Sequence, residues 1–137
     1  MLADCSKFNN GGLMNATLTD AEQIAQKITG YVQGCETGDG VHFKAAFHPD
    51  ARMFGHVGPD RYDEPIFGGM DAAVADQPVG EYDTRILSID VSGDAAAVKL
   101  AESRFWGQDF IDFFLLSRIA GEWQIVAKSF DHIGPTA

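Results

Sequence analysis

The chain has 137 residues, of which 45% are apolar and 22% charged, so it fits one globular domain and is neither a disordered tail nor a coiled coil overall. Twenty acidic against ten basic side chains give a formal charge of −10, which argues against nucleic acid or anionic lipid as a partner. No apolar run approaches the roughly 20 residues that span a bilayer, so we predict a soluble, cytoplasmic protein with no membrane partner.

The first predicted helix begins at a capping box. The Thr19 hydroxyl can accept the backbone N–H of Glu22, whose carboxylate reaches back to residue 19. Apolar residues then recur at helical spacing as far as Cys35, and Gly38 ends the helix. We predict a loose tail over residues 1–15, one domain over 16–133 and a short C-terminal tail over 134–137.

A second, short helix follows Asp39 and carries Phe43 and Phe47, and Pro49 ends it. Residues 51–57 are predicted to form a strand. The turn-rich stretch 58–65 is predicted to be a loop long enough to act as a lid. One or two helical turns are expected around residues 69–75.

From Tyr82 onward the hydrophobic period is two, which predicts an antiparallel meander. The expected strands cover 84–91, 95–106, 109–119 and 122–132, separated by glycine-containing turns. In the second of them, Glu102 and Arg104 interrupt an apolar row that ends at Trp106. The third is apolar on both faces, so we expect a homodimer that forms through the sheet.

Four segments in this order resemble the nuclear transport factor 2-like (NTF2-like) superfamily: Tyr31-Val32-Gln33-Gly34, Phe47-His48-Pro49-Asp50-Ala51, residues 89–96 and residues 121–130. Within it the chain is similar to the bacterial branch called putative lumazine-binding or SnoaL-like. The resemblance implies an α+β, cystatin-like fold, with a cone of curved antiparallel sheet of five to six strands covered by N-terminal helices. It also implies a deep pocket, but membership of a fold does not give a function.

Three residues are candidates for acid–base chemistry. Glu102 suits a general acid or base, or else forms a structural ion pair with Lys128 or Arg104. Lys128 either orients a ligand or lies at the surface with its ammonium in water. His56 either moves protons at the mouth of the cone or packs against a loop. We find no strand-borne pair of aspartates of the kind that some members of the superfamily use.

Aromatic side chains and one histidine are the candidates for binding an apolar or heteroaromatic molecule, unless they form the core instead. They are Tyr31, Phe43, Phe47, Phe54, Tyr62, Trp106, Phe114, Phe130 and His132.

No nucleotide, redox-cofactor or hydrolase-nucleophile motif is present in the sequence, and the histidine spacing does not favour a metal site. We therefore expect no cofactor. Three functions stay open at this point: a small-molecule-binding domain, a cofactor-independent isomerase, dehydratase or hydrolase, and a non-catalytic interaction module.

Overall fold

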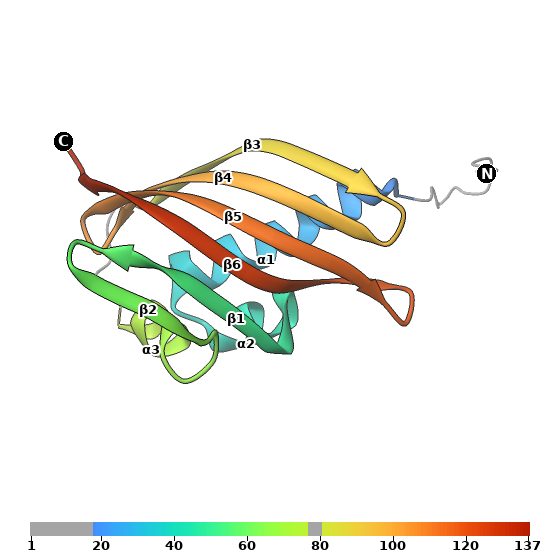
Figure 1. The fold of residues 1–137 in the computed structure, drawn as a ribbon, viewed down its shortest axis with the longest axis horizontal. Coiled ribbons are helices and arrows are strands. Elements are labelled where there is room, and N and C mark those ends of the chain that lie inside the picture. The colour runs from blue at the N-terminus through green and yellow to red at the C-terminus, as the bar shows by residue number, and fades with distance from the viewer. Residues whose placement is uncertain (1–17, 77–80) are drawn as a thin grey trace.

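The computed structural model describes residues 18–76 and 81–137, so the predicted tail over 1–15 lies outside the described residues. Within these two ranges, six strands form one curved sheet in the order β2-β1-β6-β5-β4-β3, and three helices lie on one side of it (Figure 1). The elements are α1 (Asp20–Thr37), α2 (Gly40–Ala46), β1 (Phe47–Val57), β2 (Asp60–Pro65), α3 (Met70–Ala75), β3 (Asp83–Ser92), β4 (Ala95–Phe105), β5 (Gln108–Ile119) and β6 (Glu122–Pro135). The α+β architecture predicted from the sequence is confirmed.

Helix α1 covers the inner face of the sheet. Its capping box is present, with Glu22 N–H donating to Thr19 Oγ1 at 3.2 Å and Thr19 N–H donating to Glu22 Oε1 at 2.8 Å. It ends at Gly38, whose φ of 71° is the left-handed conformation that glycine adopts readily. The predicted apolar stripe is buried against the strands and includes Tyr31 and Cys35.

Strand β1 begins earlier than predicted and pairs differently. α2 ends at Ala46, and Phe47 already has extended dihedrals. Pro49 disfavours helical geometry at His48, so the helix cannot continue past this point. β1 pairs with β6 in parallel, whereas every other pair is antiparallel. The chain crosses from β2 through α3 to the far edge of the sheet, and the meander β3–β6 then returns to β1.

The stretch 58–65 is not a loop. Gly58 and Pro59 form a tight turn, and Asp60–Pro65 form the edge strand β2, paired with β1. Alternation within this strand turns Tyr62 and Glu64 inward, and an edge position tolerates the proline at its end.

The end of β4 departs from the predicted alternation. Its register shifts between Glu102 and Phe105, and Arg104 and Trp106 both have positive φ. Phe105 is therefore buried instead of Trp106, which is 47% exposed. At the C-terminus, β6 continues to Pro135 and Thr136 N–H bonds to Gly107 O, so this end is part of the sheet rather than a tail.

Candidate functional site

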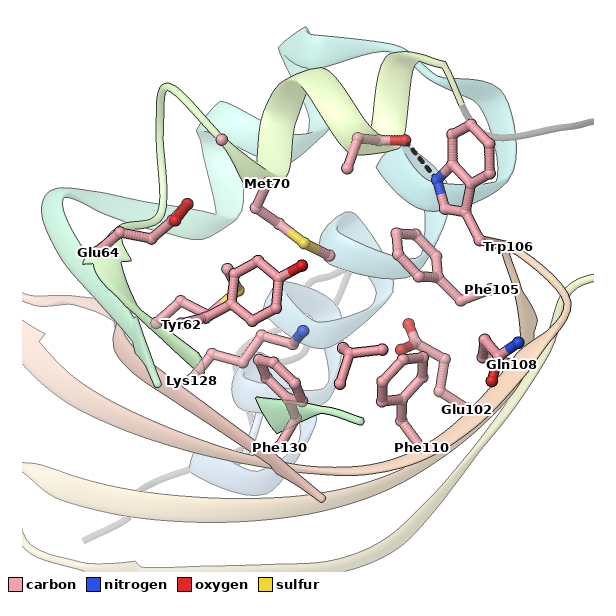
Figure 2. A pocket seen from close by; sticks show the side chains of 14 residues that line it. Tyr62, Glu64, Met70, Glu102, Phe105, Trp106, Gln108, Phe110, Lys128 and Phe130 are labelled. Atoms are coloured by element: carbon pink, nitrogen blue, oxygen red, sulfur yellow. Dashed lines mark hydrogen bonds between the residues drawn. The ribbon is translucent and has the colours of Figure 1, made fainter. Parts of the chain in front are cut away.

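A cavity of about 310 Å³ lies between the inner face of the sheet, the β1–β2 hairpin and α3 (Figure 2). Apolar and aromatic side chains dominate its wall. Tyr62, Glu102 and Lys128 extend their polar tips into it. Its lining is Met53, Val57, Tyr62, Glu64, Gly69, Met70, Ala73, Glu102, Phe105, Trp106, Gln108, Phe110, Lys128 and Phe130.

Glu102 lies on β4 just before the register shift and is buried. Two tyrosine hydroxyls donate to the same carboxylate oxygen, Oε2: Tyr31 from α1 at 2.8 Å and Tyr82 at 2.5 Å. Burial is the main cause that raises the pKa of each phenol, so both hydroxyls keep their protons at neutral pH. Neither tyrosine uses the other oxygen, Oε1.

Asp112 is the second buried carboxyl of the site, and it lies on β5 beside Glu102. Leu100 pairs with Asp112 and Glu102 pairs with Phe110, so the two acids are diagonal neighbours on the inner face. We call Glu102 and Asp112 the carboxyl pair. Burial raises the pKa of Asp112, and Glu102 raises it further. The carboxyl pair consists of one glutamate and one aspartate, so the sequence analysis, which considered only pairs of aspartates, did not identify it.

Lys128 brings a positive charge to the same place from β6. Its side chain is buried and its Nζ lies 3.8 Å from Asp112 Oδ1. The ammonium also lies 4.9 Å from the ring centroid of Phe130 and 5.6 Å from that of Tyr31, within range of cation–π attraction. Lys128 is therefore not a surface lysine.

The ion pairs considered for Glu102 are not the ones that form. Arg104 lies within the register shift, and its Nε donates to Glu81 O. The ion pair of Lys128 is with Asp112. Tyrosine hydroxyls, rather than a cation, hold the Glu102 carboxylate.

Five of the predicted site residues line the cavity. They are Tyr62, Glu102, Trp106, Lys128 and Phe130. Four predicted ligand-binding aromatics do not line it and pack together in the core instead, with ring centroids 4.8 to 5.9 Å apart. These four are Tyr31, Phe43, Phe47 and Phe114.

The remaining predicted residues also lie outside the lining. Alternation along β1 turns Met53 inward, so Phe54 and His56 are on the opposite, exposed side. His132 accepts from Gly58 N–H through Nδ1 at 3.3 Å, and its Nε2 lies 2.7 Å from Gln108 Oε1. Gln108 lines the cavity, so His132 contacts a lining residue without lining the cavity itself.

The sequence reasoning missed several residues of the site. Glu64 and Gln108 line the cavity, and Tyr82 bonds to Glu102. Asp112 could have been predicted from the sequence, because it interrupts the apolar row that includes Phe110 and Phe114.

Across 18–76 and 81–137, no three His, Cys, Asp or Glu side chains gather as a metal-binding group. In the same ranges no helix has the length and hydropathy needed to cross a bilayer. The absence of a cofactor stays a prediction.

Comparison with known proteins gives the family. A model of the family described as putative lumazine-binding matches residues 19–131. An NTF2-like protein of unknown function from Methylobacillus flagellatus is 31% identical, with a TM-score of 0.77 over 86% of this chain and 95% of that one. Another from Shewanella baltica is 25% identical, with a TM-score of 0.75 over 85% and 98%. The aldolase FrzH of a Cladobotryum species is 29% identical over 121 residues, which are 82% of this chain and 93% of that protein. The chain therefore belongs to the putative lumazine-binding family of the NTF2-like superfamily, as its motifs predict.

Proposed function

We propose that this protein is a cofactor-independent acid–base enzyme that binds a small, mainly apolar carbonyl compound and transfers a proton at the carbon next to the carbonyl. Glu102 accepts the proton, and Lys128 stabilises the negative charge that develops on the oxygen. The observation that carries this proposal is the burial of two carboxyls and one lysine beside a mainly apolar cavity.

Binding alone would not need these groups. Removing a charge from water costs several kcal/mol, and a wall of aromatic and methionine side chains holds an apolar guest without charged groups. Ionisable groups whose environment is strongly perturbed gather at catalytic sites more often than elsewhere. The open cavity also favours ligand binding over a pure interaction module, in which the cone would be filled.

The wall favours a flat, aromatic or heteroaromatic guest. Phe130 stacks edge-on against Phe110, with 5.6 Å between ring centroids, and Phe105 continues the same surface at 6.3 Å from Phe110. Offset and edge-on ring contacts of this kind stabilise aromatic ligands. A volume of about 310 Å³ is at the small end of ligand pockets.

The proposed step needs only groups that line the cavity. The C–H bond breaks and its proton goes to the Glu102 carboxylate. Its electron pair forms a C=C bond to the carbonyl carbon, and the C=O π pair moves onto the oxygen. The Lys128 ammonium then faces an enolate oxygen. Aldol chemistry begins with this same proton removal, so the similarity to an aldolase is consistent with the reaction class.

Native mass spectrometry of the purified chain should first reveal any co-purified molecule. Deuterium uptake by small cyclic and aromatic ketones in D₂O, followed by proton NMR, then tests the chemistry. We expect Glu102→Gln to slow this exchange by about 10²- to 10⁴-fold. The exposed Glu36→Gln serves as the control and should exchange at the wild-type rate. Exchange that is unchanged in Glu102→Gln would remove Glu102 from the mechanism.

We also propose a homodimer that forms through the outer face of the sheet. Phe54, Phe113 and Leu115 lie on this face and are 40, 48 and 55% exposed. Pairing aligns Phe54 with Ser129 and Ser129 with Phe113, so the two aromatic side chains lie on either side of Ser129, and Leu115 follows Phe113 on the same face of β5. We call these three residues the outer-face patch. A cytoplasmic location stays a prediction.

A further inference from the structure

Asp112 is unusually placed for an aspartate. It is 0% exposed, and no N–H or O–H group of residues 18–76 or 81–137 reaches either carboxyl oxygen within hydrogen-bond distance. Lys128 Nζ, at 3.8 Å, is too far for a hydrogen bond. Buried carboxylates normally accept hydrogen bonds, because an ionised group without them is strongly destabilised in an apolar interior.

Its neighbour Glu102 explains why Asp112 has no N–H or O–H donor. Two ionised carboxylates have four acceptor oxygens and no donor, so a hydrogen bond within the carboxyl pair requires one member to carry a proton. Tyr31 and Tyr82 both donate to Glu102, and hydroxyl donors stabilise the ionised form of the acid that accepts from them. Asp112 receives no such donor and is therefore the member that carries the proton.

The summed charge of Glu102, Asp112 and Lys128 also assigns the proton to Asp112. Lys128 contributes one positive charge and Glu102 one negative charge, so a protonated Asp112 leaves the group neutral. Ionising both acids would leave a net negative charge in the core, and protonating both would leave a net positive one. The other titratable side chains around the pair are Tyr31, Tyr82 and Cys35, and burial raises the pKa of each so that all three are uncharged.

We propose that Asp112 is a positioning residue that holds one proton against Glu102, so that the carboxyl pair, Lys128 and the bound ligand together stay neutral through the catalytic cycle. This inference rests on the proposed function for its catalytic meaning. Before reaction, Lys128 balances the single negative charge of the pair. When Glu102 takes the proton of the ligand, the pair becomes neutral and Lys128 becomes the counter-ion of the ligand's oxyanion. No charge is created in the apolar interior during the step.

The test is spectroscopic and needs no substrate. Infrared spectra of the full chain at pH 7 should contain the C=O stretch of a protonated carboxyl, which ionised aspartates and glutamates lack. We expect this band to be lost in Asp112→Asn and kept in Asp90→Asn, whose aspartate is exposed on β3. In Glu102→Gln the band should shift, because the charged acceptor of the Asp112 proton is gone.

Carbon-13 NMR of wild-type protein labelled at the aspartate carboxyls gives a second measurement. It does not depend on whether any variant folds. One aspartate resonance should keep the chemical shift of a protonated carboxyl through neutral pH. The absence of both the band and this resonance at pH 7 would overturn the proposal and leave Asp112 as an ionised partner of Lys128. Presence of both, together with no deuterium exchange in any ketone, would retain the protonated Asp112 and reject the proposed reaction instead.

Discussion

The indole Nε1 of Trp106 donates a hydrogen bond to Ala73 O at 3.0 Å, which joins the end of β4 to α3 at the edge of the cavity (Figure 2). Both residues line the cavity, and the Trp106 side chain is half exposed. α3 spans six residues and has no side-chain cap. The contact with Trp106 therefore restrains the helix that closes this side of the site.

Trp106→Phe keeps an aromatic ring and removes the donor. A net hydrogen bond contributes about 0.5–1.5 kcal/mol, so local opening of α3 should become roughly 2- to 10-fold more frequent. Hydrogen exchange at the amides of Ala73 and Asp76 measures this opening, with α1 amides as the internal reference. Phe54→Leu, which changes another half-exposed aromatic away from the cavity, should leave α3 unaffected. Equal exchange rates in Trp106→Phe and wild type would show that α3 is held by its packing alone.

Gly55 determines where the Phe130 ring lies. A Cβ at Gly55 would stand 2.7 Å from three carbons of that ring, which is closer than such atoms approach. Gly55→Ala should therefore lower the free energy of unfolding by about 1–3 kcal/mol and displace one wall of the cavity. Urea denaturation measures the change.

Gly40→Ala is the matched control, because nothing lies within 4 Å of a Cβ at Gly40. That position is in α2, so alanine should be neutral or stabilising by about 0.4–1 kcal/mol. Adding Phe130→Leu to Gly55→Ala should restore part of the lost stability. Full wild-type stability of Gly55→Ala alone would mean that the ring moves aside without strain.

The hydrophobic pattern predicted the four long strands and the capped α1, because period-two and period-3.6 repeats report directly which side chains are buried. It also identified Glu102, a charge in an apolar row of β4. The same reasoning applied to β5 would have found Asp112. Alternation counted from Met53 would likewise have placed His56 on the outer face, away from the cavity. The partners of Glu102 were beyond such reasoning, since Tyr31 and Tyr82 reach it from distant segments.

The end of β4 could not be predicted for a different reason. Arg104 and Trp106 adopt positive φ, which residues other than glycine seldom do, and no local sequence signal marks them. The shift they produce separates Arg104 from Glu102 and brings Phe105 into the wall of the cavity. The parallel pairing of β1 with β6 likewise depends on the crossover through α3, which a strand-by-strand pattern does not reveal.

The contribution of Asp112 to the free energy of unfolding should fall as the pH rises. An ordinary salt-bridged acid shows the opposite dependence. The pKa of Asp112 is raised by folding, so below about pH 3.9 its carboxyl is protonated in both states. As the pH rises, the unfolded chain releases this proton and the folded chain keeps it, so the contribution of Asp112 falls by up to about 1.4 kcal/mol per pH unit. The free energy of unfolding of the wild type, relative to Asp112→Asn, should therefore fall between pH 4 and pH 7.

Urea unfolding at several pH values measures this difference, and Asp90→Asn reports the general effect of losing a carboxylate. A wild-type advantage that instead grows between pH 4 and pH 7 would mean that folding lowers the pKa of Asp112, which is then ionised in the folded chain and paired with Lys128.

The outer-face patch should hold two copies of the chain together. Monomeric proteins rarely expose neighbouring large apolar side chains of this kind, and a stable dimer buries about 800 Å² on each partner. Replacing Phe113 and Leu115 with serine should weaken association at least tenfold, because each removes a central apolar contact. Sedimentation should then change from a dimer to a 14.8 kDa monomer. Val41→Ser is the control, since Val41 is 72% exposed on α2, on the other side of the sheet. A wild-type chain that sediments as a monomer at micromolar concentration would contradict the dimer, and the exposed patch would then need another partner to cover it.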